Sequence, residues 1–146
     1  MTYTDADRLI QEYLAANWTT TQIAWPNVEP RSFVPIGQPL LPMGTSDYIA
    51  LRSHGTGSQT ITVNRKCVRY TGQLFVAVCV KEGTGVRTAK GHTDTLVNLL
   101  ENKTITEHGT GDVRMNTITG PTEYPAPNGW FVIEFAIMYA FERFVN

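Results

Sequence analysis

The stretch WFVIEFAIMYAFERFV, residues 130–145, constrains the fold more than any other segment of the chain. Two sets of residues alternate along it with a period of two, which is the period of a β-strand. The purely apolar set is expected to face the core and consists of Phe131, Ile133, Phe135, Ile137, Tyr139 and Phe141. The other set contains Glu134 and Glu142 among apolar residues, and we expect it to contact another chain rather than open water. Because charges interrupt the run, it falls short of the roughly 20 apolar residues that a membrane helix needs.

Two other segments have the apolar spacing of amphipathic helices. Residues 4–17 are expected to begin at Thr4 as the capping residue, followed by aspartates in the first turn, where the helix dipole favours negative charge. Residues 86–102 carry the second apolar stripe. Each of the two helices would therefore bury one face against a sheet.

The remaining apolar segments are typical of strands. DYIALRS at 47–53 alternates, HGTG at His54–Gly57 predicts a turn, and residues 61–70 and 73–82 predict a hairpin around a Thr71-Gly72 turn. After the second helix, a second HGTG at 108–111 predicts a turn before a strand at 112–119. The sequence thus predicts a single α+β domain over residues 1–146, a mostly antiparallel β-sheet with two α-helices packed on one face.

Two cysteines do not form a disulfide framework. In the hairpin register set by the Thr71-Gly72 turn, Cys67 and Cys79 point to opposite faces of the sheet, where their thiols cannot bond. Both are therefore expected to be packing residues.

The segment 28–47 is expected to be a long irregular loop, because it holds four prolines and two glycines. It also carries Phe33, Ile36, Leu40 and Leu41, four apolar side chains that a free monomer would expose. These side chains predict a surface that contacts a partner, either a neighbouring subunit or another protein, unless they fold back on their own sheet.

Charge is unevenly distributed along a chain whose net charge is only −1. Residues 1–51, 52–90 and 91–146 carry net charges of −3, +6 and −4, which add to −1. The basic middle includes Arg65, Lys66 and Arg69 on one predicted strand. Contact with acidic residues of a neighbouring subunit is favoured, while nucleic-acid binding by this segment stays open as an alternative.

Motifs for catalysis are weak. Neither HGTG is accompanied by the G-x-S-x-G of a nucleophile elbow, and EGTGVRTAKG departs from the phosphate-binding P-loop pattern. His54, His92 and His108 do not lie at zinc-ligand spacing from one another or from a cysteine. We expect no enzyme, no cofactor and no metal, and keep a small hydrolase built on the histidine turns as a remote alternative.

The stretch TTQIAWPN at 20–27 follows the first helix and precedes DYIALR, GQLFVAVCV, a helix and the aromatic C-terminal strand. This order, with I-A-W-P-N as its best motif, resembles the tail terminator (tail completion) proteins of long-tailed bacteriophages over nearly the whole chain. Trp25 is expected to end a short strand at the edge of the sheet, with Pro26 preventing further strand addition, and it can equally be a core aromatic.

The resemblance implies a structural virion protein without catalytic residues. Members of that family form rings, mostly of six subunits, on the head-proximal end of the tail tube, where they stop tube polymerisation and offer a docking surface to a head-tail connector or stopper protein. Genomic DNA passes through the pore without sequence-specific binding. The implied location is the virion, after synthesis in the host cytoplasm, with no membrane partner. Another connector component remains an alternative.

Overall fold

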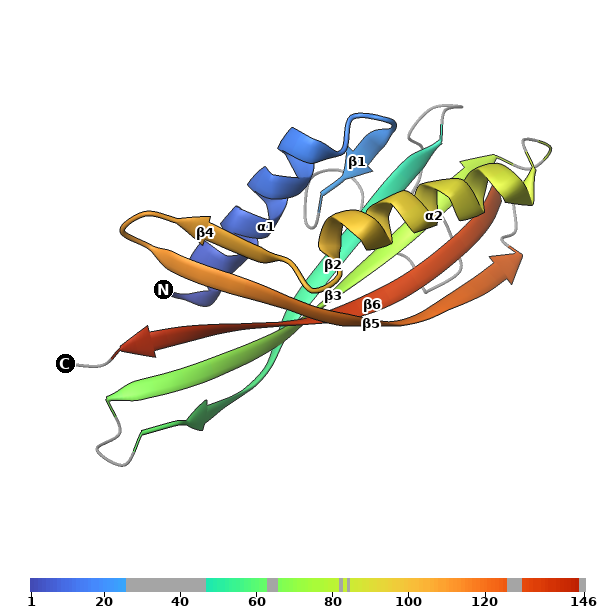
Figure 1. The fold of residues 1–146 in the computed structure, drawn as a ribbon. Helices are drawn as coiled ribbons and strands as arrows, with labels where there is room; N and C mark the ends of the chain where they lie inside the picture. Colours follow the sequence, from blue (N-terminus) through green and yellow to red (C-terminus); the bar gives the residue numbers. More distant parts are fainter. Residues whose placement is uncertain (26–46, 63–65, 82, 84, 126–129, 145–146) are drawn as a thin grey trace.

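The computed structural model describes residues 1–25, 47–62, 66–81, 83, 85–125 and 130–144. The elements in chain order are α1 (Tyr3–Asn17), β1 (Gln22–Ala24), β2 (Tyr48–Thr60), β3 (Cys67–Lys81), α2 (Val86–Leu100), β4 (Thr104–Glu107), β5 (Gly111–Pro125) and β6 (Trp130–Phe144). The strands form one sheet in the order β1-β2-β3-β6-β5-β4, in which only β1 and β2 pair in parallel. The predicted α+β fold is confirmed (Figure 1).

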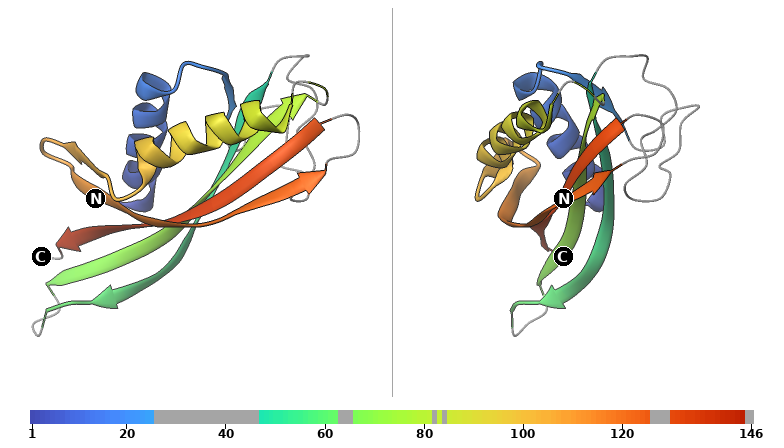
Figure 2. Two further views of the ribbon diagram at one scale, coloured as in Figure 1. Left: turned by 45° about the vertical axis from the view of Figure 1, so that its right-hand side comes forward. Right: turned by 90° about the vertical axis from the view of Figure 1, so that its right-hand side faces the viewer.

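Both helices cover the same face of the sheet (Figure 2, right). The core under them joins Leu9, Ile10 and Leu14 of α1 to Leu96 and Leu100 of α2 through the strands. As predicted, β6 contributes its purely apolar set to this core: Ile133, Phe135, Ile137, Tyr139 and Phe141 are buried, with Phe131 packed beside them. We call this face of the sheet the helix face and the opposite one the open face.

Helix α1 begins earlier than the sequence predicted. The capping residue is Thr2, whose hydroxyl accepts a hydrogen bond from the backbone N–H of Asp5 at 3.2 Å. The Asp5 carboxylate in turn accepts a hydrogen bond from the backbone N–H of Thr2 at 2.9 Å, which completes a capping box. The prediction that Thr4 caps the helix is therefore wrong, because the reciprocal pair lies two residues upstream.

The predicted hairpin around Thr71-Gly72 is also wrong. Strand β3 runs without a break through Gly72, paired to β2 on one side and to β6 on the other. The chain reverses instead between Thr60 and Cys67. A glycine fits the middle of this central strand because the ring of Tyr139 on β6 lies directly over it.

The two cysteines consequently lie on one strand. Cys67 and Cys79 are twelve residues apart on β3, so about 40 Å separates them at roughly 3.3 Å per residue. An even separation puts both on the open face, contrary to the prediction of opposite faces, and both are free and buried. Burial raises the pKa of the Cys79 thiol to about 12.

The two HGTG segments fold differently. The copy at 54–57 lies within β2, where the pairing with β3 shifts between Gly55 and Gly57, so the predicted turn is wrong. The copy at 108–111 makes the β4–β5 turn as predicted, with Gly109 and Gly111 at φ of 85° and 128°. Beyond it, β5 continues to Pro125, past the predicted end at residue 119.

Candidate assembly surface

Trp25 directly follows β1, the short strand at one edge of the sheet. The side chains of Trp25 and Ile23 are half-buried against the core of the helix face. The expected edge strand is present, but it ends one residue before Trp25, and Pro26 lies outside the described residues. Trp25 packs beside the core as an aromatic residue, as the second interpretation expected. Phe33, Ile36, Leu40, Leu41 and Arg65 lie outside the described residues.

The open face carries a second, smaller apolar cluster, formed by Ala24, Tyr48, Ala50, Ala77, Cys79 and Val132. It lies where β1, β2, β3 and β6 meet, at the end of the sheet farthest from both chain termini (Figure 1). Trp130 packs against it, with its ring centroid 5.3 Å from that of Tyr48. Apolar packing on this sheet is therefore not confined to the helix face.

Glu134 lies beside that cluster, opposite Ala77 in the register of β6 and β3. Only 9% of its surface is exposed. Burial raises the pKa of its carboxyl, while the attraction of Arg52 acts in the opposite direction. The Arg52 guanidinium carbon lies 4.5 Å from the centre of the Phe75 ring, on which His54 stacks at 5.5 Å. The middle of the open face thus carries an arginine and a histidine side chain against one aromatic ring, with a buried carboxyl group of raised pKa beside them.

Glu142 lies toward the other end of the same face, as the period-two pattern predicted. Its Oε1 accepts hydrogen bonds from Arg69 at 3.0 Å and from Arg114 at 2.8 Å. These two bonds hold the pKa of Glu142 below its ordinary value. The charge of Arg69 thus has a partner within the chain, and its predicted contact with a neighbouring subunit stays a prediction. Lys66 is exposed one residue before β3 begins.

Beyond this ion cluster, the end of the sheet carries aromatic side chains on both faces. Tyr3 of α1 meets Tyr70 and Phe141 edge-on, with ring centroids 5.6 and 5.1 Å apart, on the helix face. Phe144 closes β6 opposite Cys67 on the open face and is the most exposed large apolar side chain of the described residues. No sequence pattern predicts this grouping, because Tyr3 reaches it only through the packing of α1.

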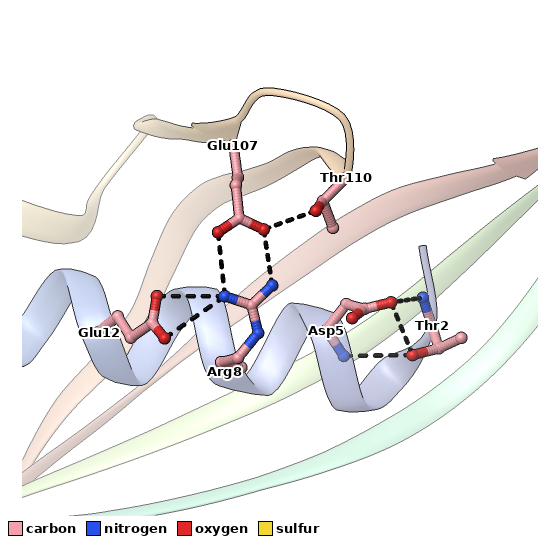
Figure 3. Close-up of polar contacts among 6 residues, drawn as sticks. All are labelled: Thr2, Asp5, Arg8, Glu12, Glu107 and Thr110. Carbon is pink, nitrogen blue, oxygen red and sulfur yellow. Dashed lines mark hydrogen bonds and ion pairs between the residues drawn. The ribbon is translucent and has the colours of Figure 1, made fainter.

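A second ion cluster fixes α1 to the β4–β5 hairpin (Figure 3). The two Nη atoms of Arg8 donate to the two carboxylate oxygens of Glu107 at 3.0 and 2.6 Å, and Arg8 also bonds Glu12. The Thr110 hydroxyl donates to Glu107 at 2.6 Å. Arg8 and Thr110 together lower the pKa of Glu107 to about 2. This cluster holds the N-terminal helix, and with it Tyr3, in place.

The three histidines do not gather at one place. His54 stacks on Phe75, the Nε2 of His92 lies 3.8 Å from the Asp47 carboxylate, and His108 lies in the β4–β5 turn. Within the described ranges, no three His, Cys, Asp or Glu side chains are grouped as metal ligands. Neither described helix has the length and hydrophobicity needed to cross a lipid bilayer.

No family model matches the chain, and no curated protein matches it. Among the solved structures that do match, one has a TM-score of 0.62, covers 95% of this chain and 96% of that chain, and is 17% identical in sequence. A likeness at this level of identity bears on the fold alone, and it shows that a solved protein shares this architecture over 95% of the chain.

Proposed function

We propose that this chain is a structural subunit of a ring, most simply a hexamer, at the head-proximal end of a phage tail tube. The ring would stop polymerisation of the tube protein and would offer its outer surface to a head-tail connector or stopper protein. DNA would pass through its pore without base-specific contacts.

The observation that carries the proposal is the agreement between the resemblance and the order of elements. The segments on which the resemblance rests form six elements in the expected order: helix α1, edge strand β1 with QIA, strand β2 from YIALR, central strand β3 with LFVAVCV, helix α2 and the aromatic strand β6. Trp25 directly follows the last residue of the edge strand, at the point where the motif I-A-W-P-N has it.

The difference between the two faces of the sheet supports the same proposal. Both described helices cover one face, and the open face mixes apolar side chains with arginines and glutamates. Arginine, methionine and aromatic residues are enriched where proteins meet one another. Arg52 and Phe75 pair across β2 and β3, and Met138 of β6 lies opposite Gln73, two positions along β3 from Phe75; all three are half-exposed side chains of this kind on the open face.

Tail length gives the test. In a phage that encodes this chain, an amber codon early in its gene should yield filled heads and separate tails whose tubes exceed the normal length, as measured by negative-stain microscopy. A plasmid that supplies the intact chain should restore tails of uniform length joined to heads. Normal, head-joined tails in the non-suppressing host would overturn the proposal.

A further inference from the structure

Phe144 lies at the end of β6, and 74% of its surface is exposed. Of the other large apolar side chains in the described residues, Val86 is 44% exposed and Ile61 is 38% exposed. Phe144 pairs with Cys67 of β3 and lies three residues after the core residue Phe141. Since alternate residues of a strand point to opposite faces, Phe144 lies on the open face, away from the helices.

A hollow of about 120 Å³ lies at the same end of the sheet but on the helix face. Met1, Thr2, Tyr3, Tyr70, Phe141 and Arg143 line it. The rings of Tyr70 and Phe141 stack across β3 and β6 with centroids 5.4 Å apart, and Tyr3 stands perpendicular to both. The walls are therefore mostly aromatic and aliphatic, with one guanidinium among them.

The size and chemistry of this hollow suit a phenyl ring. An apolar cavity of roughly 150 Å³ in another protein accommodates benzene, so a hollow of the present size, open on one side, can take most of a phenylalanine ring. Edge-to-face contact with tyrosine and phenylalanine is the arrangement that aromatic rings prefer, and the guanidinium of Arg143 can lie over an inserted ring.

Phe144 of the same chain cannot fill the hollow, because it projects from the opposite face of the strand that forms the wall. A second copy can fill it. Each subunit carries Phe144 on one face and the hollow on the other. It can therefore insert Phe144 into one neighbour and accept the Phe144 of a second neighbour in its own hollow. Contacts of this head-to-tail kind close into rings when the rotation between subunits permits.

We propose that Phe144 of one subunit inserts into the hollow lined by Tyr3, Tyr70 and Arg143 of the next copy. This inference rests on the proposed ring, and it names the contact that joins adjacent subunits. The substitution Phe144→Ala removes the phenyl group and should weaken association of the subunits about tenfold or more, because a buried aromatic anchor carries much of the energy of an interface.

Photocrosslinking tests the contact directly. The intact protein carrying benzoylphenylalanine at position 144 is mixed with an equal amount of isotopically labelled wild-type chain, concentrated and irradiated. Crosslinks between labelled and unlabelled peptides should join position 144 to the peptide that holds Tyr3 or the one that holds Tyr70. The same photoreactive residue at Val86, which is exposed at the start of α2, is the control and should not reach those peptides.

Mixing half-defective subunits tests the direction of the contact. Phe144→Ala keeps the hollow, whereas Arg143→Trp keeps Phe144 and fills the hollow from an exposed strand position. Each variant alone should be a monomer in sedimentation velocity, and an equal mixture should form one-to-one dimers and nothing larger. Failure of the mixture to dimerise would overturn the contact, and a wild-type chain that stops at dimers would show that the contact is self-complementary and not head-to-tail.

The outcomes separate this inference from the proposed function. The proposed contact would be overturned if position 144 formed no crosslinks at any concentration, or crosslinks only to other peptides, while rings were still seen on tails. The proposed ring would then remain supported. Crosslinks to the hollow in a phage whose tails have normal length without this chain would overturn the proposed function and leave the contact.

Discussion

Tyr139 of β6 pairs with Gly72 of β3, and the Tyr139 ring occupies the space that a side chain at position 72 would need. A Cβ built on Gly72 would come within 2.7 Å of the Tyr139 Cε1 atom, so the ring or the strand would have to move. The glycine is thus required by a neighbour that is distant in sequence and not by a turn.

Gly72→Ala is therefore expected to lower the free energy of unfolding by about 1–3 kcal/mol, the usual cost of overpacking a core. Gly91→Ala is the matched control, because a Cβ built there in α2 has no atom within 4 Å apart from its chain neighbours and the backbone of its own helix. That change should stabilise the protein by about 0.5–1 kcal/mol through helix propensity. Urea denaturation measures both, and equal effects of the two substitutions would contradict the packing.

The capping box at the start of α1 gives a second prediction. Thr2→Ala removes the hydroxyl that accepts the Asp5 N–H, and should lower the free energy of unfolding by about 1 kcal/mol. Thr4→Ala changes an exposed residue inside the helix and should stay within about 0.5 kcal/mol. If Thr4→Ala lowered the free energy of unfolding more than Thr2→Ala, the capping residue would be Thr4 and not Thr2.

Glu107 gives a prediction on pH. Arg8 and Thr110 hold its pKa at about 2 in the folded protein, below its ordinary value of 4.5. The unfolded chain therefore binds this proton first as the pH falls, and the contribution of Glu107 to stability is complete above pH 4.5 and is lost as the pH approaches 2. The slope of unfolding free energy against pH in this window should be smaller in Glu107→Gln.

Carbon-13 NMR of the Glu107 carboxyl checks the same point without a mutation. Its chemical shift should remain that of the ionised form down to about pH 3. A midpoint at the ordinary value of 4.5 would show that the bonds from Arg8 and Thr110 do not persist in solution.

Arg69 and Glu142 give a prediction that separates contacts within the chain from contacts between subunits. Arg69→Glu should lower the free energy of unfolding of the monomer by about 0.5–1 kcal/mol, since the pair is partly exposed. The exchanged double variant, Arg69→Glu with Glu142→Arg, should recover only part of that loss, because the arginine at position 142 would lose the ion pair with Arg114 and repel it. If the single change leaves the monomer unaffected but abolishes assembly, the partner of Arg69 lies on another subunit.

The sequence predicted the helices and the β6 strand well, because their periodicity is a local property that burial on one face imposes. It failed at Thr71-Gly72 and His54–Gly57, where glycines that usually mark turns lie inside long strands. In the structure, Gly72 lies under Tyr139 and Gly55 under Tyr3, and neither contact can be inferred from neighbouring residues. The glycines at 109 and 111 were interpreted correctly, since their positive φ serves a local turn.

The candidate surface was predicted only in part. Alternation along β6 correctly assigned Glu134 and Glu142 to one face, but it could not show that Arg69 and Arg114 both bond to Glu142. The aromatic hollow depends on α1 bringing Tyr3 to β3 and β6, a contact between residues about 70 positions or more apart.

Cryo-electron microscopy of intact tails most directly tests the central claim that this chain forms the ring at the head-proximal end. We predict a single ring of density at that end, most simply of six subunits, into which this fold fits with Phe144 directed toward the neighbouring copy. A tube that ends at the head-proximal side without density for this chain, in particles shown by mass spectrometry to contain it, would contradict the account.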